Sequence, residues 1–103
     1  MKKLAIVTGA NKGLGLSVAQ KLVHDNYKVI LACRDKTKGQ QAEKFLGENT
    51  TFMELDLSDP ESIDNFSNEI SQSYSGVDVL YNNAGLIYQD FNLTAEGFES
   101  MIA

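Results

Sequence analysis

Short apolar runs alternate along this chain with stretches in which apolar residues recur every three or four positions. The runs are typical of buried strands, and the recurring pattern is typical of amphipathic helices. Strands are predicted at 3–8, 28–33, 51–55 and 77–81, and helices at 13–25, at 36–46 and from 58–61 through Tyr74. This order predicts an α/β fold with a parallel sheet, right-handed connections and helices on both faces. Such sheets bind ligands at the carboxyl ends of their strands.

The end of the chain predicts a further helix. After a loop that follows Gly85, Thr94 can cap a helix with Phe98, Met101 and Ile102 on one face. The sequence stops within this helix, without a terminating Gly or Asn. We therefore expect residues 1–103 to form one incomplete domain of four βα units. We also expect the chain alone to be marginal or aggregation-prone, because the strand at 77–81 would become an apolar edge.

The composition excludes several classes of protein. Hydrophobic residues make up 43% of the chain and occur in blocks, which argues against disorder. The apolar runs are far shorter than the ~20 residues that cross a bilayer. Nine Lys and Arg against fourteen Asp and Glu give a net charge of −5, which argues against a general nucleic-acid binder. Cys33 is the single cysteine, so we expect no disulfide, no metal site and a reducing, cytoplasmic setting.

A glycine-rich turn, Thr8-Gly9-Ala10-Asn11-Lys12-Gly13-Leu14-Gly15, joins the first strand to the first helix. Gly9 would adopt a conformation that a side chain forbids, Gly13 would let the backbone approach a phosphate, and Gly15 would let the helix pack closely. The N–H groups of the helix would then point at a pyrophosphate. The alternative is a plain strand–helix turn, but this context is the one that a dinucleotide-binding motif requires. Without a Gly-Lys-Ser/Thr sequence, a phosphate loop of the NTPase type is excluded.

Cations follow the second predicted strand. Arg34, Lys36 and Lys38 lie there, and Lys12 lies in the glycine turn. Since guanidinium grips phosphate through two hydrogen bonds, Arg34 and Lys12 predict a site for the 2′-phosphate of NADPH. The alternative is solvated surface charge, which we favour for Lys36. Asp35 argues the other way, because an acid at the strand end holds the ribose hydroxyls in sites that prefer NADH.

Polar and small residues follow the third and fourth predicted strands. Asp56 can accept a hydrogen bond from the adenine amino group while Leu57 packs on the ring. The alternative for Asp56 is a capping or turn residue. Asn82-Asn83-Ala84-Gly85 allows backbone and cofactor to come close, and the alternative is a simple Asn/Gly turn. Cys33 is expected to be a small buried residue rather than a nucleophile.

These motifs stand in the order and spacing of the short-chain dehydrogenase/reductase family, and the chain resembles the N-terminal half or less of such an enzyme. It is most similar to the NADPH-dependent carbonyl reductases at 7–16, 32–40 and 74–80. Retinol-dehydrogenase-like reductases share much of the middle stretch and also the segment 93–99. The resemblance implies a Rossmann-type doubly wound parallel sheet with NADPH (NADP) as its cofactor.

The resemblance also implies a role for each matching residue. In this reading, the pyrophosphate and ribose are lined by Gly9, Asn11, Lys12, Gly13 and Leu14. The 2′-phosphate is held by Arg34 and Lys38, and the adenine is bounded by Asp56 and Leu57. The backbone passes behind the ribose and nicotinamide at Asn82, Ala84 and Gly85.

The family's chemistry is hydride transfer from the nicotinamide to a carbonyl, with a proton from a Tyr-x-x-x-Lys pair. No Tyr-x-x-x-Lys sequence occurs here, so we expect no catalytic residues within this chain and no activity from it alone. The leading hypothesis is the cofactor-binding part of a carbonyl reductase whose full-length form takes a small-molecule substrate. The alternative is an NADP(H)-binding module without a reaction, acting in redox sensing or subunit pairing. Neither nucleic acid nor membrane is an expected partner.

Overall fold

The computed structural model describes residues 2–11 and 13–82, together with the backbone course of 85–92. The described elements follow one another as β1 (Leu4–Thr8), α1 (Gly13–His24), β2 (Lys28–Cys33), α2 (Lys36–Leu46), β3 (Thr50–Glu54), α3 (Pro60–Ser73), β4 (Gly76–Asn82) and β5 (Gly85–Asn92). The predicted strands and helices as far as β4 are confirmed, with ends that agree to within about two residues. No helix within the described ranges is long and apolar enough to cross a membrane.

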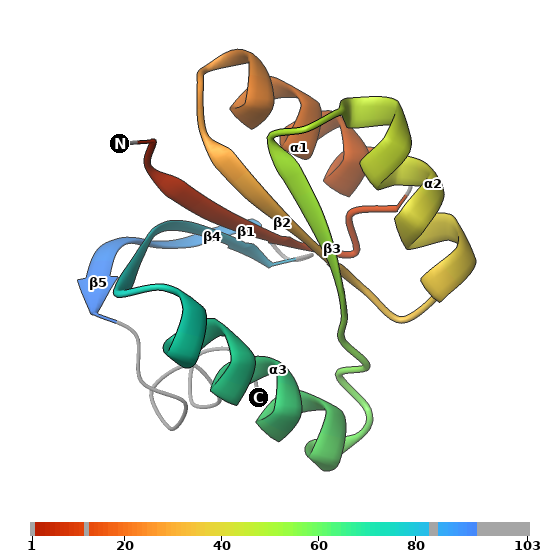
Figure 1. The fold of residues 1–103 in the computed structure, drawn as a ribbon, viewed down its shortest axis with the longest axis vertical. Helices are drawn as coiled ribbons and strands as arrows, with labels where there is room; N and C mark the ends of the chain where they lie inside the picture. Colours follow the sequence, from red (N-terminus) through yellow and green to blue (C-terminus); the bar gives the residue numbers. More distant parts are fainter. Residues whose placement is uncertain (1, 12, 83–84, 93–103) are drawn as a thin grey trace.

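One sheet with strand order β3-β2-β1-β4-β5 forms the centre of the structure (Figure 1). β1 pairs in parallel with both β2 and β4, and β2 pairs in parallel with β3. The predicted α/β sheet of parallel strands is thereby confirmed. Because the chain continues from β1 to one side and later returns to the other, the sheet has its topological switch point between β1 and β4.

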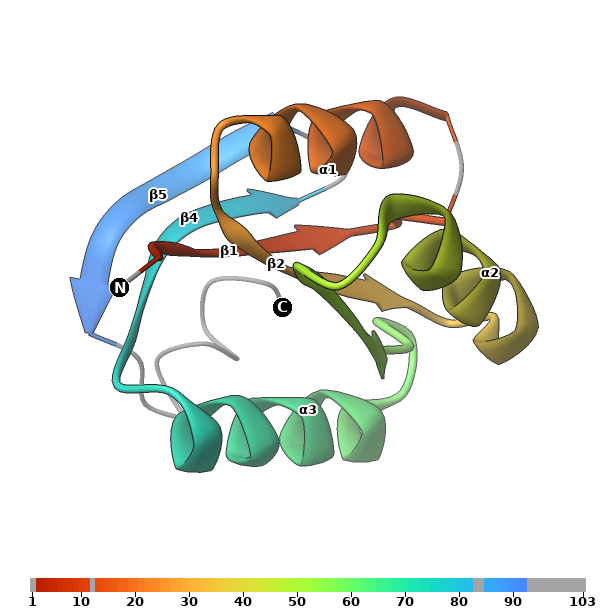
Figure 2. The same ribbon diagram turned by 45° about the horizontal axis from the view of Figure 1, so that its top comes forward.

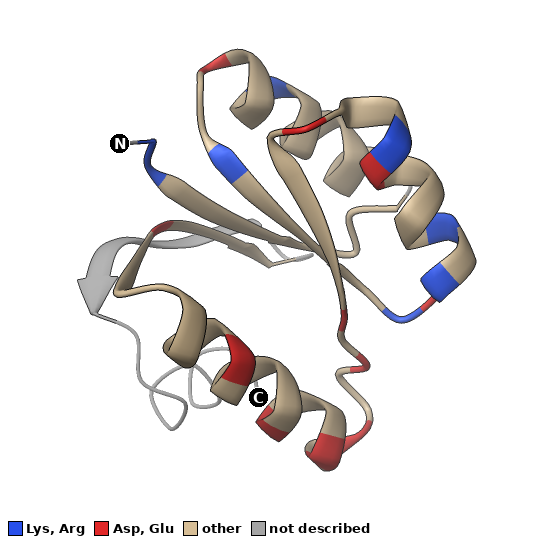
Figure 3. Ribbon diagram, in the orientation of Figure 1, with Lys and Arg blue, Asp and Glu red and all other residues tan. Residues whose placement is uncertain are grey.

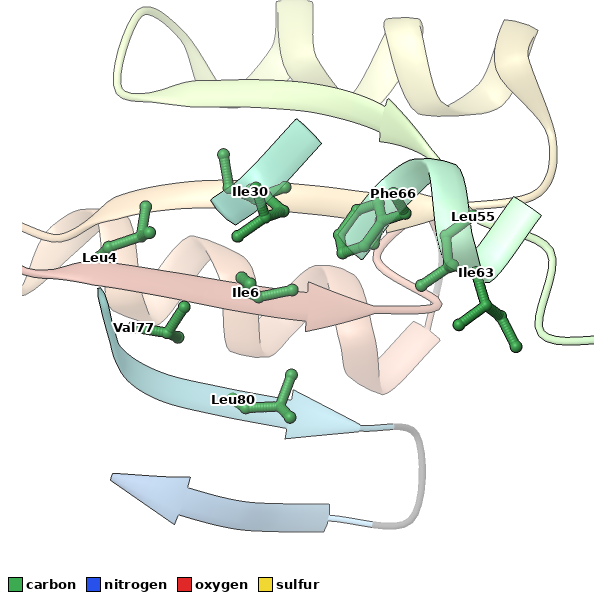
Figure 4. Packing of buried hydrophobic residues seen from close by; sticks show 10 residues of the cluster. Leu4, Ile6, Ile30, Leu55, Ile63, Phe66, Val77 and Leu80 are labelled. Atoms are coloured by element: carbon green, nitrogen blue, oxygen red, sulfur yellow. The ribbon is translucent and has the colours of Figure 1, made fainter. Parts of the chain in front are cut away.

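Helices cover both faces of this sheet. Figure 2 shows α1 on one side and α3 on the other. On the α3 side, Ile6, Ile30 and Leu80 meet Phe66 and Ile70 in one apolar cluster, all at most 2% exposed (Figure 4). A second cluster joins α1 and α2 to the opposite face of the sheet. It consists of the alternate strand residues Ala5, Val7, Val29 and Leu31, together with Ala19 of α1 and Ala42 of α2. Burial on both faces explains why the strands read as continuous apolar runs.

Side chains at the helix ends fix where α2 and α3 begin. The carboxylate of Asp35 accepts a hydrogen bond from the Lys38 N–H at 3.0 Å and caps α2. Asp59 does the same for α3 through the Glu61 N–H, also at 3.0 Å, with Pro60 in the first turn. These caps satisfy backbone donors that a helix leaves unpaired at its start.

The segment 85–92 corrects the prediction of a loop after Gly85. It is the strand β5, which pairs antiparallel with β4, from Gly76 opposite Asn92 to Asn82 opposite Gly85. The expectation that β4 would be the apolar edge is therefore wrong for this structure. Unpaired backbone groups along β4 are costly to leave without partners, and the segment that follows directly in the sequence pairs with them. The helix predicted from Thr94 lies outside the described residues.

The turn between β1 and α1 depends on Gly15. A Cβ atom at this position would lie well inside van der Waals contact distance of the Gly9 carbonyl oxygen and close to the Cα of Ala10. Both contacts are with backbone, so no side chain can move away to make room. The role predicted for Gly15, close packing at the start of the helix, is thus visible in the geometry.

Replacing Gly15 by Ala should force α1 away from the end of β1. We expect Gly15→Ala to lower the free energy of unfolding by about 2–3 kcal/mol, the size of an overpacked core substitution. Thermal or urea denaturation measures this. A matched control is Gly13→Ala, whose Cβ would have no atom within 4 Å and which carries only the strain of its positive φ. Equal losses for both variants would contradict the packing explanation.

Candidate cofactor-binding site

A pocket of about 400 Å³ opens at the carboxyl ends of β1, β2 and β3. Its walls come from the last residues of β1 and β2 and from the segments that follow the three strands, namely Thr8, Gly9, Asn11, Ala32, Cys33, Arg34, Leu55, Asp56, Leu57 and Ser58. Three motifs that are far apart in the sequence thus meet in one place, because parallel strands end at the same edge of the sheet. This arrangement agrees with the prediction that a ligand site lies at the carboxyl ends of the strands.

The glycine turn forms one wall of the pocket. The Gly9 N–H donates to the carbonyl oxygen of Ala32 at 2.8 Å, which ties the turn to the end of β2. Gly9 has φ 64° and Gly13 has φ 58°, both in the left-handed region. Nothing lies within 4 Å of where a Cβ of Gly13 would be, so the first turn of α1 is open to a close approach. A phosphate fits such an opening at a helix N-terminus.

Leu14 and Lys12 are the other residues of the turn with a predicted role in the site. Leu14 is 67% exposed on the first turn of α1 and does not line the pocket. Lys12, predicted to face the 2′-phosphate, lies outside the described residues.

Arg34 and Lys38 stand on either side of the start of α2. Arg34 is exposed and lines the pocket beside Asp56. Lys38 lines a neighbouring hollow of about 370 Å³ with Leu16 and Phe45, and Asn11 borders both spaces. The two predicted phosphate ligands therefore line different hollows, and the structure does not bring them together in one pocket.

Asp35 has a structural role at the start of α2. Its carboxylate caps α2 through the Lys38 N–H, and it does not line the pocket. At the end of β2, Arg34 lines the pocket and Asp35 does not. Figure 3 shows basic (blue) and acidic (red) residues side by side between the end of β2 and the start of α2, whereas acidic residues recur along α3.

The partly buried Asp56 is held in place by hydrogen bonds to its side chain. Its Oδ1 accepts from the Ser58 hydroxyl at 2.6 Å and from the Ser58 N–H at 3.0 Å. These hydrogen bonds, the side-chain one first, hold the pKa of Asp56 below its usual value, and the charge of Arg34 adds to the effect. The carboxylate therefore stays ionised and can act only as an acceptor. Leu57, next to it, is 42% exposed and supplies an apolar surface at the pocket.

Asn82 lies at the switch point between β1 and β4. Its Oδ1 accepts a hydrogen bond from the Thr8 hydroxyl at 3.0 Å, so the ends of both strands are joined through side chains. Gly85 pairs with Asn82 across the β4–β5 hairpin. Ala84, which we predicted to be part of the same site, lies outside the described residues. Asn82 does not line the pocket over β1–β3, so the described site consists of one pocket and a separate polar junction.

Sequence reasoning missed two serines at this site. Ser58 fixes the carboxylate of Asp56, and the Ser62 Oγ accepts from the Asp56 N–H at 2.9 Å. A Ser that follows an Asp after one intervening residue is a common sign of a side-chain-stabilised turn, and this signal could have identified Ser58. Ser62 comes from α3, and only the packing of that helix start against the end of β3 brings it here.

The fold is a doubly wound α/β sheet, and its pocket lies at the strand ends, where proteins of this architecture bind ligands. The comparisons with known proteins agree: the family model described as short chain dehydrogenase matches residues 3–103. Salutaridine reductase from Papaver somniferum is 36% identical over 99% of this chain, and retinol dehydrogenase 11 from Mus musculus is 39% identical over 97%. The chain belongs to the short-chain dehydrogenase/reductase family, as the motifs predicted.

Solved structures show the same architecture. Salutaridine reductase from Papaver somniferum superposes with a TM-score of 0.75 at 36% identity, over 98% of this chain and 35% of the other. An actinorhodin polyketide ketoreductase variant, solved with NADPH, gives a TM-score of 0.73 at 28% identity, over 80% of this chain and 33% of the other. The chain spans about a third of the length of the curated relatives it matches, 34% and 33% for the first two.

Cys33 provides a direct probe of this pocket. It is 4% exposed, and its Sγ lies 3.6 Å from the carbonyl oxygen of Asp35. Burial is the largest cause of its raised pKa, so the thiol is protonated and weakly reactive near neutral pH. We expect iodoacetamide at pH 8 to alkylate Cys33 at least tenfold more slowly than free cysteine, and NADPH to slow it further. Mass spectrometry reads the single cysteine without interference. Alkylation at the rate of free cysteine would contradict the burial.

Proposed function

We propose that this chain is the cofactor-binding part of an NADPH-dependent oxidoreductase that reduces carbonyl compounds. One observation carries the proposal: the glycine turn, Arg34 and the Asp56–Leu57 pair line a single pocket at the strand ends. These are the groups that the phosphates, the 2′-phosphate and the adenine of NADPH require. Bound there, the cofactor would supply the hydride, and the residues described here would bind and orient it.

Each end of the adenosine half of the cofactor has a matching group. The open first turn of α1 offers backbone N–H groups and the positive end of the helix dipole to the pyrophosphate. Arg34 offers two parallel N–H groups to the 2′-phosphate, with Lys12 and Lys38 as further charges. Asp56 would accept from the adenine amino group, and Leu57 would cover the ring. At the switch point, Asn82, Ala84 and Gly85 would run behind the ribose and nicotinamide.

The substrate class follows from the relatives rather than from this pocket. Salutaridine reductase, menthone neomenthol reductase from Mentha piperita and a polyketide ketoreductase are all named as reductases. We infer that the full-length enzyme takes a small-molecule carbonyl substrate, with neither nucleic acid nor membrane as a partner. A cytoplasmic location fits the single buried thiol.

A second candidate is a non-catalytic NADP(H)-binding module. It is supported by the sequence, in which no Tyr-x-x-x-Lys occurs, and by the roles proposed above, which assign every described site residue to the cofactor. The two candidates differ in what a longer product of the same gene contains. A carbonyl reductase needs an Asn soon after position 103 and a Tyr-x-x-x-Lys pair further on, whereas a sensing or pairing module needs neither.

Neutral replacements of the predicted phosphate ligands test the cofactor. We expect Arg34→Gln combined with Lys12→Gln to weaken NADPH binding about 100-fold and NADH binding less than threefold, because NADH has no 2′-phosphate. Calorimetric titration or the fluorescence of the reduced nicotinamide measures both affinities. The matched control is Lys36→Gln, which removes an exposed charge of the same helix start and should leave both affinities within twofold. Equal losses of NADPH and NADH binding in the double variant would remove the argument for NADPH.

The chain of 103 residues should bind NADPH without using it. We expect no consumption of NADPH above background with a panel of small aldehydes and ketones, because the proton donor pair is not in this sequence. Absorbance of the reduced nicotinamide measures this, and a titration on the same sample confirms that the cofactor is bound. Measurable turnover by the purified chain would show that other residues carry the reaction.

A further inference from the structure

The turn between β3 and α3 is closed by hydrogen bonds at both backbone polar groups of Asp56 and at its Oδ1. The Asp56 carbonyl oxygen accepts from the Asp59 N–H at 3.1 Å, and the Asp56 N–H donates to the Ser62 Oγ at 2.9 Å. Asp59 in turn caps α3. The backbone of Asp56 is therefore fixed by the start of α3, and the remaining freedom of the residue lies in its side chain.

Ser58 removes that freedom. Its hydroxyl and its N–H both donate to Oδ1 of Asp56, at 2.6 and 3.0 Å. Within the described part of the chain, Oδ2 accepts no hydrogen bond. One oxygen is thus anchored to the turn, and the other is left to accept from a group in the pocket that Asp56 and Ser58 both line.

We propose that Ser58 is a positioning residue for adenine recognition, because it holds the Asp56 carboxylate with one oxygen directed to an exocyclic amino group. This inference rests on the proposed function, and it adds a residue to which neither the motif nor the resemblance gave a role. A carboxylate fixed beforehand loses less side-chain entropy when it binds. An ionised acceptor favours a base with an amino group at this position and disfavours a base with a carbonyl oxygen there.

The test compares NADPH with an analogue that has hypoxanthine in place of adenine. The analogue also carries the reduced nicotinamide, and it differs by a carbonyl oxygen where adenine has its amino group. The wild-type chain should bind NADPH about tenfold more tightly than the analogue, by calorimetric titration. Ser58→Ala removes the hydroxyl but not the N–H, and it should reduce this preference to threefold or less. Ser58→Thr retains both donors and should keep the preference. Ser73→Ala, at the exposed end of α3, is the matched control and should change neither affinity.

A double-mutant cycle separates positioning from a general loss of structure. In an Asp56→Ala background, Ser58→Ala should have no further effect on the preference between the two nucleotides, since no carboxylate remains to be held. A wild-type preference that Ser58→Ala leaves intact would overturn the inference, as would an equal further loss in the Asp56→Ala background. Binding of NADPH without any preference would overturn the role of Asp56 and this inference but leave the cofactor site. No binding of NADPH to the wild-type chain would overturn the proposed function itself.

Discussion

The close approach of Gly15 to the carbonyl of Gly9 is the contact on which the rest of the structure depends. It lets the chain turn sharply from the end of β1 into α1, so the N-terminus of the helix lies at the edge where the parallel strands end. β1 is also the strand that pairs with both β2 and β4, so this turn sits near the centre of the sheet. A side chain at position 15 would move α1, and with it the wall of the pocket.

Much of the fold could be predicted from the sequence because the parallel strands are buried on both faces. The run from Lys28 to Cys33 is apolar almost throughout, and the structure has the strand with these same ends. The end of α2 at Gly47 and the capped start of α3 at Asp59 follow from local chemistry in the same way. Local signals of this kind need no knowledge of distant neighbours.

The features that the sequence did not predict depend on which segments meet in space. The sequence predicts a loop at 85–92, where the structure has β5. This strand forms because its backbone pairs with that of β4, and the sequence of the segment alone does not indicate that pairing. The sequence allows both a ribose-binding and a capping role for Asp35, and the structure shows that its carboxylate caps α2. Lys38 carries the expected charge, yet it borders a different hollow from Arg34. Ser62 joins the site only through the packing of α3.

On the proposed function, the described site is the adenosine-binding half of a cofactor site, in which Asp56, Arg34 and the glycine turn line one pocket. Nuclear magnetic resonance titration with adenosine 2′,5′-bisphosphate, the adenosine fragment of NADPH, tests this central claim most directly. The account predicts amide shift changes concentrated at Gly9–Gly15, at Cys33 and Arg34, and at 55–58, with weaker binding of adenosine 5′-phosphate. Shift changes that avoid these residues, or equal binding of the two nucleotides, would contradict it.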